Sequence, residues 1–277
     1  MNFPHQWIMF GPGLLIPVFF LAICPVSGQI NQQETNVIAC GGAYVSRSGY
    51  INASSNQAGL GWIDSRSVSI QHTRPFIAAD LGISSISVQL TTGQGAFGAN
   101  LTCYGIKGLY STSGWLSYGM RLHPAITAGA GIHFWFSTIQ AGFIYHPGIS
   151  CGLGIQARIN ERLVIGGHVM NPAGWSSDHP GRENPQMILS AGCSYRFFNV
   201  ATYHTHLQMS PGLQFRMSHG IELTISDIVI LLLGMHNLPY AASLGIEIET
   251  SAWNIQVAAE YLLDTGSIPS SALSYVW

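Results

Sequence analysis

From Arg66 to the last residue, hydrophobic and polar positions alternate along the chain with a period of two. Between residues 149 and 159, for example, Ile, Cys, Leu, Ile, Ala and Ile alternate with Ser, Gly, Gly, Gln and Arg. This period predicts β-strands that have one apolar face. About 14 strands are expected, or 12 if short neighbours merge, in the segments 67–74, 84–92, 96–106, 114–122, 125–136, 149–159, 163–170, 187–197, 200–209, 211–218, 220–226, 228–236, 239–249 and 253–261.

The residues on the polar faces of these strands distinguish between two folds that bury the apolar faces, a soluble β-sandwich and a membrane β-barrel. A soluble sandwich exposes its polar faces to water and needs many charged side chains there, whereas only 8% of this chain is charged and Gly alone fills 32 positions. A membrane barrel turns its apolar faces to lipid and lines its interior with small polar residues and a few charges. We therefore predict an all-β fold, a transmembrane antiparallel β-barrel. The side chains expected to face its lumen are Arg158, Arg196, His204, His206, Arg216, Glu222, Glu247 and Glu260.

Aromatic residues near the strand ends fit the same architecture. Trp115, Trp253 and Tyr261 are expected on the lipid-facing side, where aromatic side chains form girdles at the two membrane interfaces. The last strand places Leu273, Tyr275 and Trp277 on one face and ends at an aromatic residue. Such an ending resembles the signal by which outer-membrane barrels are recognised for assembly, so the barrel-assembly machinery and membrane lipid are expected partners.

The N-terminal part of the chain divides into two segments. Residues 1–28 predict a cleavable signal peptide, with a lipoprotein anchored at Cys24 and a retained anchor helix as alternatives. Residues 29–65 lack sustained alternation and are expected to form a plug-like segment inside the barrel of residues 66–277. Short hairpin connections are predicted at 93–95, 160–161, 218–220 and 249–251, and a longer polar surface loop at 175–186.

Several kinds of chemistry are not indicated by the sequence. A net charge of −2 offers no basic surface for nucleic acid. His204 and His206 are two apart on one strand face, so a shared metal is an alternative, but a hydrogen-bonded pair in the lumen is the preferred interpretation. Cys103, Cys151 and Cys193 fall on faces assigned to lipid, and no disulfide is expected. We predict no catalytic residue, metal or cofactor, and expect lumen-facing glycines to make room for whatever fills the interior.

Residues 41–46 (GGAYVS) and 56–60 (NQAGL) resemble the opening of FadL-like barrels, and the nearest branch is the PorV and PorQ-like proteins of Bacteroidetes. Segments 105–122, 160–163, 171–174 and 258–261 extend the similarity, although Gln57 stands where the family has a proline. The motif positions are Gly41, Gly42, Asn56, Ala58, Gly59 and Leu60.

The resemblance implies a multi-pass barrel of the bacterial outer membrane with its N-terminal segment inside. It implies a non-catalytic role in type IX protein secretion or cell-surface attachment, with type IX components as partners. The alternative is a FadL-like transporter for hydrophobic compounds. An outer-membrane lipid-modifying enzyme is a third, less favoured possibility.

Overall fold

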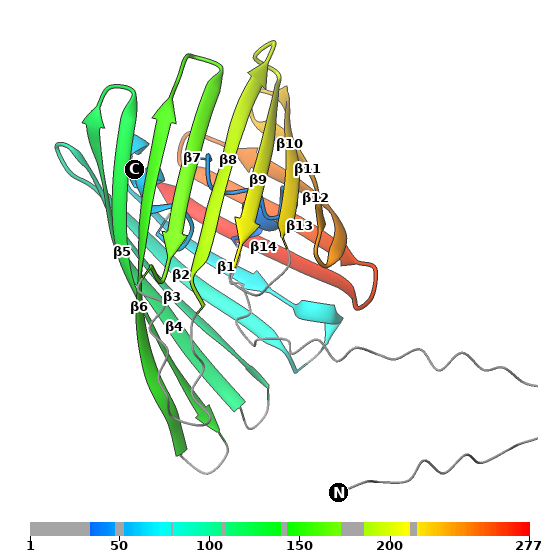
Figure 1. Cartoon of the computed structure of the whole chain (residues 1–277). Helices are drawn as coiled ribbons and strands as arrows, with labels where there is room; N and C mark the ends of the chain where they lie inside the picture. Colours follow the sequence, from blue (N-terminus) through cyan, green and yellow to red (C-terminus); the bar gives the residue numbers. More distant parts are fainter. Residues whose placement is uncertain are drawn as a thin grey trace, which may run out of the picture.

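The computed structural model contains a closed barrel of fourteen antiparallel strands in which each strand pairs with its sequence neighbours and β1 pairs with β14 (Figure 1). It describes residues 34–47, 53–78, 80–106, 109–139, 143–172, 186–210 and 215–277. The predicted signal peptide, and the predicted surface loop apart from its last residue, lie outside this part of the chain. The strands are β1 (Ser67–Thr73), β2 (Gly82–Thr91), β3 (Gly95–Ile106), β4 (Leu109–His123), β5 (Ile126–Ile139), β6 (Phe143–Arg158), β7 (Leu163–Met170), β8 (Ile188–Phe197), β9 (Ala201–Met209), β10 (Arg216–Ser226), β11 (Val229–Asn237), β12 (Tyr240–Glu249), β13 (Trp253–Leu262) and β14 (Gly266–Val276).

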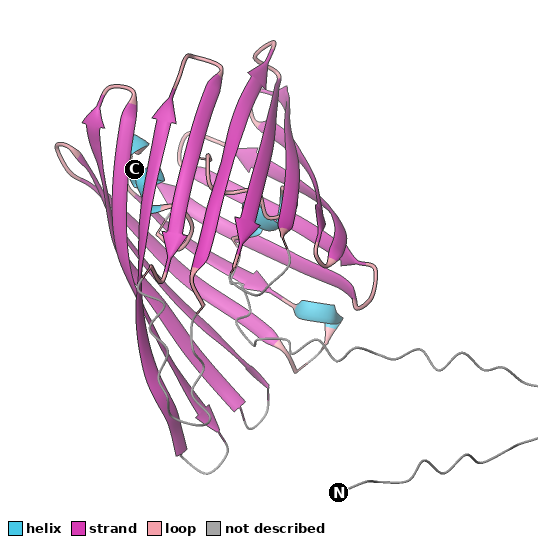
Figure 2. Cartoon of the chain, in the orientation of Figure 1, coloured by secondary structure: helices cyan, strands magenta, loops and turns pink. Residues whose placement is uncertain are grey.

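The described helical turns are short and lie inside the barrel or at its rim (Figure 2). They are α1 (Thr35–Ala39), η1 (Gln57–Trp62) and η2 (Pro75–Ile77). Among the described residues, no helix is long and apolar enough to cross a membrane. We call the end at which β1 begins and β14 finishes the proximal end, and the other the distal end.

The period-two pattern assigns the two faces of the wall correctly along most strands. In β13, exposed and buried residues alternate without interruption, and the exposed ones include Trp253, Val257 and Tyr261. Tyr275 and Trp277 are exposed on the same outer surface, and their rings stack at 5.7 Å. Apolar side chains thus cover the outside, while polar ones fill the interior, as a barrel in lipid requires.

Two sequence predictions about the wall are wrong. Residues 218–220 are not a turn, because the segments 211–218 and 220–226 contribute to the single strand β10. Its Gly220 marks a close approach of the plug: a Cβ there would lie 2.8 Å from the Cβ of Cys40. Trp115 is not in an outer girdle. It is 4% exposed, shares the inward face of β4 with Ser113 and stacks on His133, with ring centroids 4.6 Å apart.

Candidate functional site: the plug and the adjoining cavity

The N-terminal segment runs through the lumen and is held there by hydrogen bonds to the wall. The Thr35 hydroxyl lies 2.7 Å from that of Ser270 on β14, a separation at which either can donate. Further along, the Ser243 hydroxyl on β12 donates to the Ala39 carbonyl at 2.9 Å and accepts from the Gly41 amide at 3.0 Å. A small apolar cluster, formed by Ile38, Ala39, Cys40, Leu232 and Ala258, packs α1 against the wall.

The second half of this plug is fixed against β6. The Trp62 indole donates to the Gln156 side-chain oxygen at 2.9 Å, and the Gln156 amide donates to the Val45 carbonyl at 3.0 Å. Asn56 caps η1 by accepting from the Ala58 amide at 3.1 Å, and donates to the same Val45 carbonyl. Each of these side chains is buried, so the hydrogen bonds replace contacts with water and define one position for the plug.

Inward-facing glycines make this docking possible. At Gly129, Gly154, Gly166 and Gly234, a Cβ would lie less than 3.0 Å from atoms of the plug. Any larger residue at these positions would displace atoms of the plug, which are backbone atoms at Gly129, Gly166 and Gly234 and the Asn56 side chain at Gly154. The high glycine content of the strands therefore reflects a wall that is hollowed where the plug lies against it.

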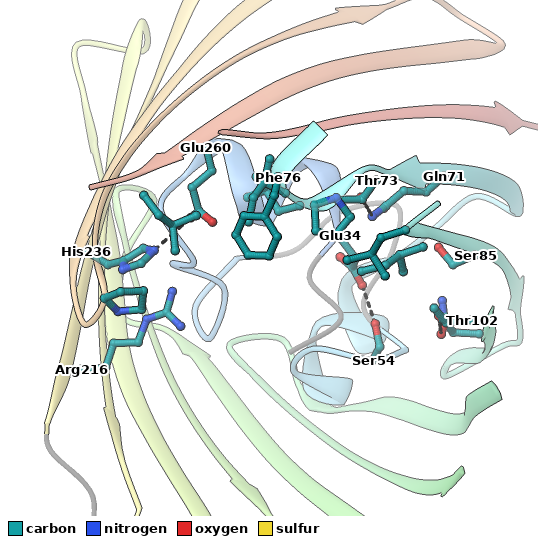
Figure 3. A pocket seen from close by; sticks show the side chains of 18 residues that line it. Glu34, Ser54, Gln71, Thr73, Phe76, Ser85, Thr102, Arg216, His236 and Glu260 are labelled. Atoms are coloured by element: carbon teal, nitrogen blue, oxygen red, sulfur yellow. Dashed lines mark hydrogen bonds and ion pairs between the residues drawn. The ribbon is translucent and has the colours of Figure 1, made fainter. Parts of the chain in front are cut away.

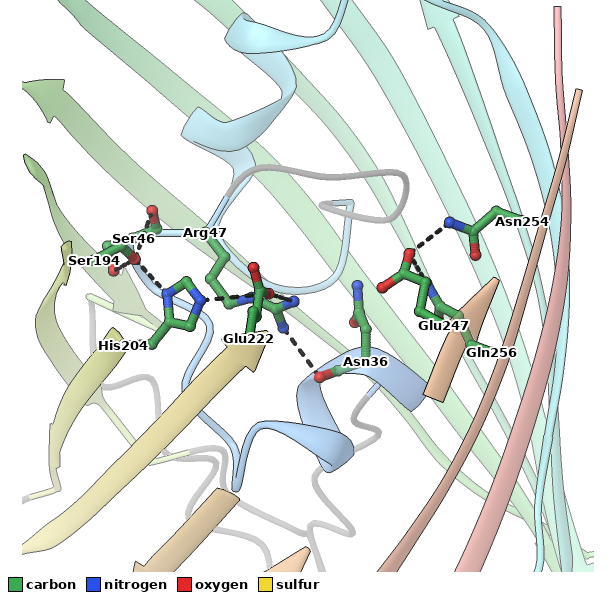
Figure 4. Close-up of polar contacts among 9 residues, drawn as sticks. All are labelled: Asn36, Ser46, Arg47, Ser194, His204, Glu222, Glu247, Asn254 and Gln256. Atoms are coloured by element: carbon green, nitrogen blue, oxygen red, sulfur yellow. Dashed lines mark hydrogen bonds and ion pairs between the residues drawn. The ribbon is translucent and has the colours of Figure 1, made fainter. Parts of the chain in front are cut away.

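An ionic anchor joins the plug to β10 (Figure 4). The Arg47 guanidinium pairs with the Glu222 carboxylate and also donates to the Asn36 carbonyl at 3.0 Å. On the wall, the second ring nitrogen of His204 lies 3.3 Å from Glu222, and its Nδ1 lies 2.6 Å from the Ser194 hydroxyl. The anchor thus ties α1, the following loop and the three strands β8, β9 and β10 together.

The family-motif residues all lie in the plug. Gly41 and Gly42 have positive φ angles of 63° and 83°, which glycine adopts without steric cost, and they turn the chain after α1. Asn56 caps η1, and Ala58, Gly59 and Leu60 lie buried within or beside that turn.

Four of the lumen-facing residues expected from the sequence lie outside the anchor and the cavity, in three different environments. Arg158 and Arg196 are exposed near the proximal end, where the Arg158 guanidinium stacks 3.8 Å above the Trp62 ring. His206 is buried beside the Tyr44 ring, at 4.4 Å, and neither of its ring nitrogens has a hydrogen-bond partner. Glu247 accepts hydrogen bonds from Asn254 and Gln256.

Arg216 and Glu260 both line one side of a cavity of about 240 Å³ near the distal end, with His236 between them (Figure 3). The cavity lies between α1, the η2 turn and the inner wall. Its surface is largely apolar, and the side chains that supply this character are Ile38, Phe76, Leu81, Ile83, Leu262 and Ile268. His236 joins the polar group at one side, where its Nε2 lies 2.9 Å from a Glu260 oxygen.

Glu34 and Ser54 form a second polar group on the cavity surface. The Ser54 hydroxyl donates to the Glu34 carboxyl at 2.9 Å. Burial raises the pKa of Glu34 from 4.5 to about 8, against the opposing effects of that hydrogen bond and the Arg47 charge. At neutral pH the carboxyl is therefore mostly protonated.

The cavity is bordered by a strained turn. In η2, Phe76 and Ile77 have φ angles of 56° and 54°, which are unfavourable for residues with bulky side chains and most of all for a β-branched one. The turn is joined to β14 by a hydrogen bond of 2.9 Å from the Arg74 amide to the Pro269 carbonyl.

Several residues of this site were not identified from the sequence. His236 and Glu34 did not stand out, and neither did Arg47, the cation of the anchor. For His236 a signal was present, because it lies on the inward face of its strand by the period of two. Among the described residues, no group of three His, Cys, Asp or Glu side chains could hold a metal ion. The four described cysteines are free, with Cys40 in the plug and the others on the outer face.

Solved structures show which known barrels share this architecture. The toluene transporter TodX of Pseudomonas putida matches with a TM-score of 0.68 at 11% identity, over 88% of this chain and 97% of that one. The toluene transporter TbuX of Ralstonia pickettii matches with a TM-score of 0.68 at 13% identity, over 90% and 98%. A FadL homologue of Pseudomonas aeruginosa has a TM-score of 0.60 at 10% identity, over 88% and 98%.

These similarities show that the chain has the fold of FadL-like β-barrels. They do not confirm the narrower PorV and PorQ-like branch. No protein-family model and no curated protein matches the sequence.

Proposed function

We propose that this chain is a non-catalytic channel of the bacterial outer membrane that admits small hydrophobic compounds. The observation that carries the proposal is the largely apolar cavity of about 240 Å³ inside a closed, plugged barrel. An apolar cavity of about 150 Å³ is already large enough to hold benzene. The size therefore favours monocyclic compounds over long-chain ones.

The orientation of the barrel follows from its connections. The proximal connections are short, whereas the distal ones include the long segment between β7 and β8. Short turns face the periplasm in outer-membrane barrels and longer loops face outward. In the proposed orientation the cavity is near the outer surface, where it would receive compounds arriving from outside. We also propose that a signal peptide, residues 1–28, directs the export of the chain to the outer membrane.

The structural neighbours favour transport over the type IX secretion hypothesis. TodX and TbuX are described as toluene transporters, and a further similar structure, CymD, as a monoaromatic hydrocarbon channel. None of the three names refers to secretion. The type IX components expected from the PorV and PorQ resemblance therefore have no support from these comparisons, and hydrophobic small molecules are the partners that we propose.

Uptake of radiolabelled toluene by cells with and without the chain tests this function. Leu262 faces the cavity and is 9% exposed, whereas its neighbour Leu263 is 67% exposed. We expect Leu262→Trp to fill much of the cavity and to slow uptake severalfold, and Leu263→Trp to leave uptake unchanged. Equal uptake by cells with and without the wild-type chain would contradict the proposed function. Normal uptake by a folded Leu262→Trp barrel would show that the cavity is not on the path.

A further inference from the structure

One side of the cavity carries polar atoms that lack hydrogen-bond partners. His236 is 5% exposed, and while its Nε2 contacts Glu260, its Nδ1 has no partner. The Nε of Arg216 is likewise buried and without a partner. Figure 3 shows these side chains grouped at one side of the cavity, across from the group that contains Glu34.

This arrangement discriminates between ligands of similar shape. A hydrocarbon that filled the cavity would remove water from the Arg216 guanidinium and the Glu260 carboxylate, which line it, and would offer them no hydrogen bond in return. A binding site that leaves buried polar groups unpaired disfavours the ligand that causes it, often more strongly than an apolar site distinguishes two apolar ligands. The occupant is therefore expected to carry a polar atom at this side and apolar surface elsewhere.

The charges of Arg216 and Glu260 indicate which polar group the ligand carries. The Arg216 guanidinium can only donate hydrogen bonds, whereas the Glu260 carboxylate, which uses one oxygen to contact His236, can accept them. A hydroxyl group satisfies both, since it accepts from one and donates to the other. A carboxylate would place a second negative charge beside Glu260, so the site matches a neutral ligand better than an anionic one.

We infer that the cavity binds neutral monocyclic compounds with a hydroxyl group, of the phenol type, in preference to hydrocarbons of the same shape. The hydroxyl lies between Arg216 and Glu260, and the ring contacts the apolar surface that includes Phe76. This inference rests on the proposed channel function and names its substrate class.

Binding to the purified full-length barrel in detergent tests this inference with two probes of matched shape, phenol and toluene. Dissociation constants are measured by equilibrium dialysis, with partition into protein-free micelles subtracted. Loss of a hydrogen bond to a charged group corresponds to about a tenfold loss of affinity or more. We expect Arg216→Met to weaken phenol binding by about that factor and to leave toluene binding within about twofold, because only phenol uses the guanidinium.

Two further measurements keep the test sharp. Arg196→Met, at an exposed position near the proximal end, is the matched control and should change neither affinity. On the wild-type protein alone, anisole should bind about tenfold more weakly than phenol, because its oxygen accepts a hydrogen bond but cannot donate one to Glu260. This comparison needs no variant and decides the question if Arg216→Met does not fold.

The outcomes separate this inference from the proposed function. Toluene binding together with an unchanged phenol-to-toluene affinity ratio in folded Arg216→Met overturns the inference and leaves the channel function standing. Equal binding of phenol and anisole by the wild type also overturns it. If neither toluene nor phenol binds, both the inference and the proposed function fail.

Discussion

Arg47 is the residue whose replacement tests most directly how the plug is held. Its side chain is 12% exposed and pairs with Glu222, which is 26% exposed. Arg47→Met keeps the apolar part of the side chain but removes its charge. The docked plug would then hold Glu222 without its arginine partner, and among the described residues His204, at 3.3 Å, would be the cation left beside it.

The expected magnitude follows from the burial of the pair. Removing one partner of a buried ion pair typically costs about 3–5 kcal/mol, because the remaining charge is left uncompensated. The partial exposure of Glu222 and its contact with His204 place this case near the lower end. Since about 1.4 kcal/mol corresponds to a factor of ten, the population with an undocked plug should rise by roughly 100-fold.

Cys40 supplies the assay. Its side chain is 0% exposed in the docked plug, and burial raises the pKa of its thiol to about 12, so the docked form is doubly protected from thiol reagents. In a chain whose only cysteine is Cys40, the labelling rate with a charged maleimide reports the undocked population. We expect this rate to rise by roughly 100-fold in Arg47→Met.

Two variants serve as controls for this experiment. Arg66→Met removes an exposed cation just before β1 and should leave the labelling rate unchanged. The double variant Arg47→Met, Glu222→Gln removes both charges of the pair. It should recover most of the protection of Cys40 from labelling, since no uncompensated charge of the pair is then left in the docked plug. A labelling rate in Arg47→Met within threefold of the wild type would refute the assignment of the pair as the anchor.

Three further predictions concern the plug and the wall. Because the pKa of Glu34 is raised from 4.5 to about 8 in the docked plug, docking should be strongest below pH 4.5 and weaken as the pH rises to 8. Cys40 labelling, corrected for thiol ionisation, should increase over this range, and a pH dependence that persists in Glu34→Gln would contradict the assignment. Gly166→Ala should increase labelling because its Cβ would lie less than 3.0 Å from the plug backbone, whereas Gly167→Ala, with 3.5 Å to its nearest neighbour, should not. Trp277→Ser should lower the amount of heat-modifiable barrel in the outer membrane, and unchanged amounts would count against an assembly signal.

The wall of the barrel was predictable from the sequence because lipid and lumen select opposite residue types at alternating positions. Errors arose where the interior imposed a different demand. Gly220 suggested a turn, yet it makes room for Cys40 within β10. Trp115 suggested an interface residue, yet it packs inside against His133, in space left by glycines on neighbouring strands.

The cavity could not be predicted in the same way. Arg216, His236 and Glu260 belong to β10, β11 and β13, whereas Phe76 follows β1, and closure of the barrel brings these distant segments around one cavity. The plug, moreover, has no periodic pattern of its own. Its path is defined by the shape of the wall around it, which exists only once the strands have paired.

The backbone of Phe76 and Ile77 has a consequence for ligand exchange in the proposed channel. Residues held in such conformations cost on the order of 1–3 kcal/mol each, and they persist only because surrounding contacts impose them. The η2 turn beside the cavity therefore stores conformational strain that its contacts with the barrel maintain. In the proposed channel, a movement that lifted the turn away from β14 and relaxed these two backbones would recover part of this energy, and the step that admits or releases a molecule would begin from a conformation already raised in free energy toward opening.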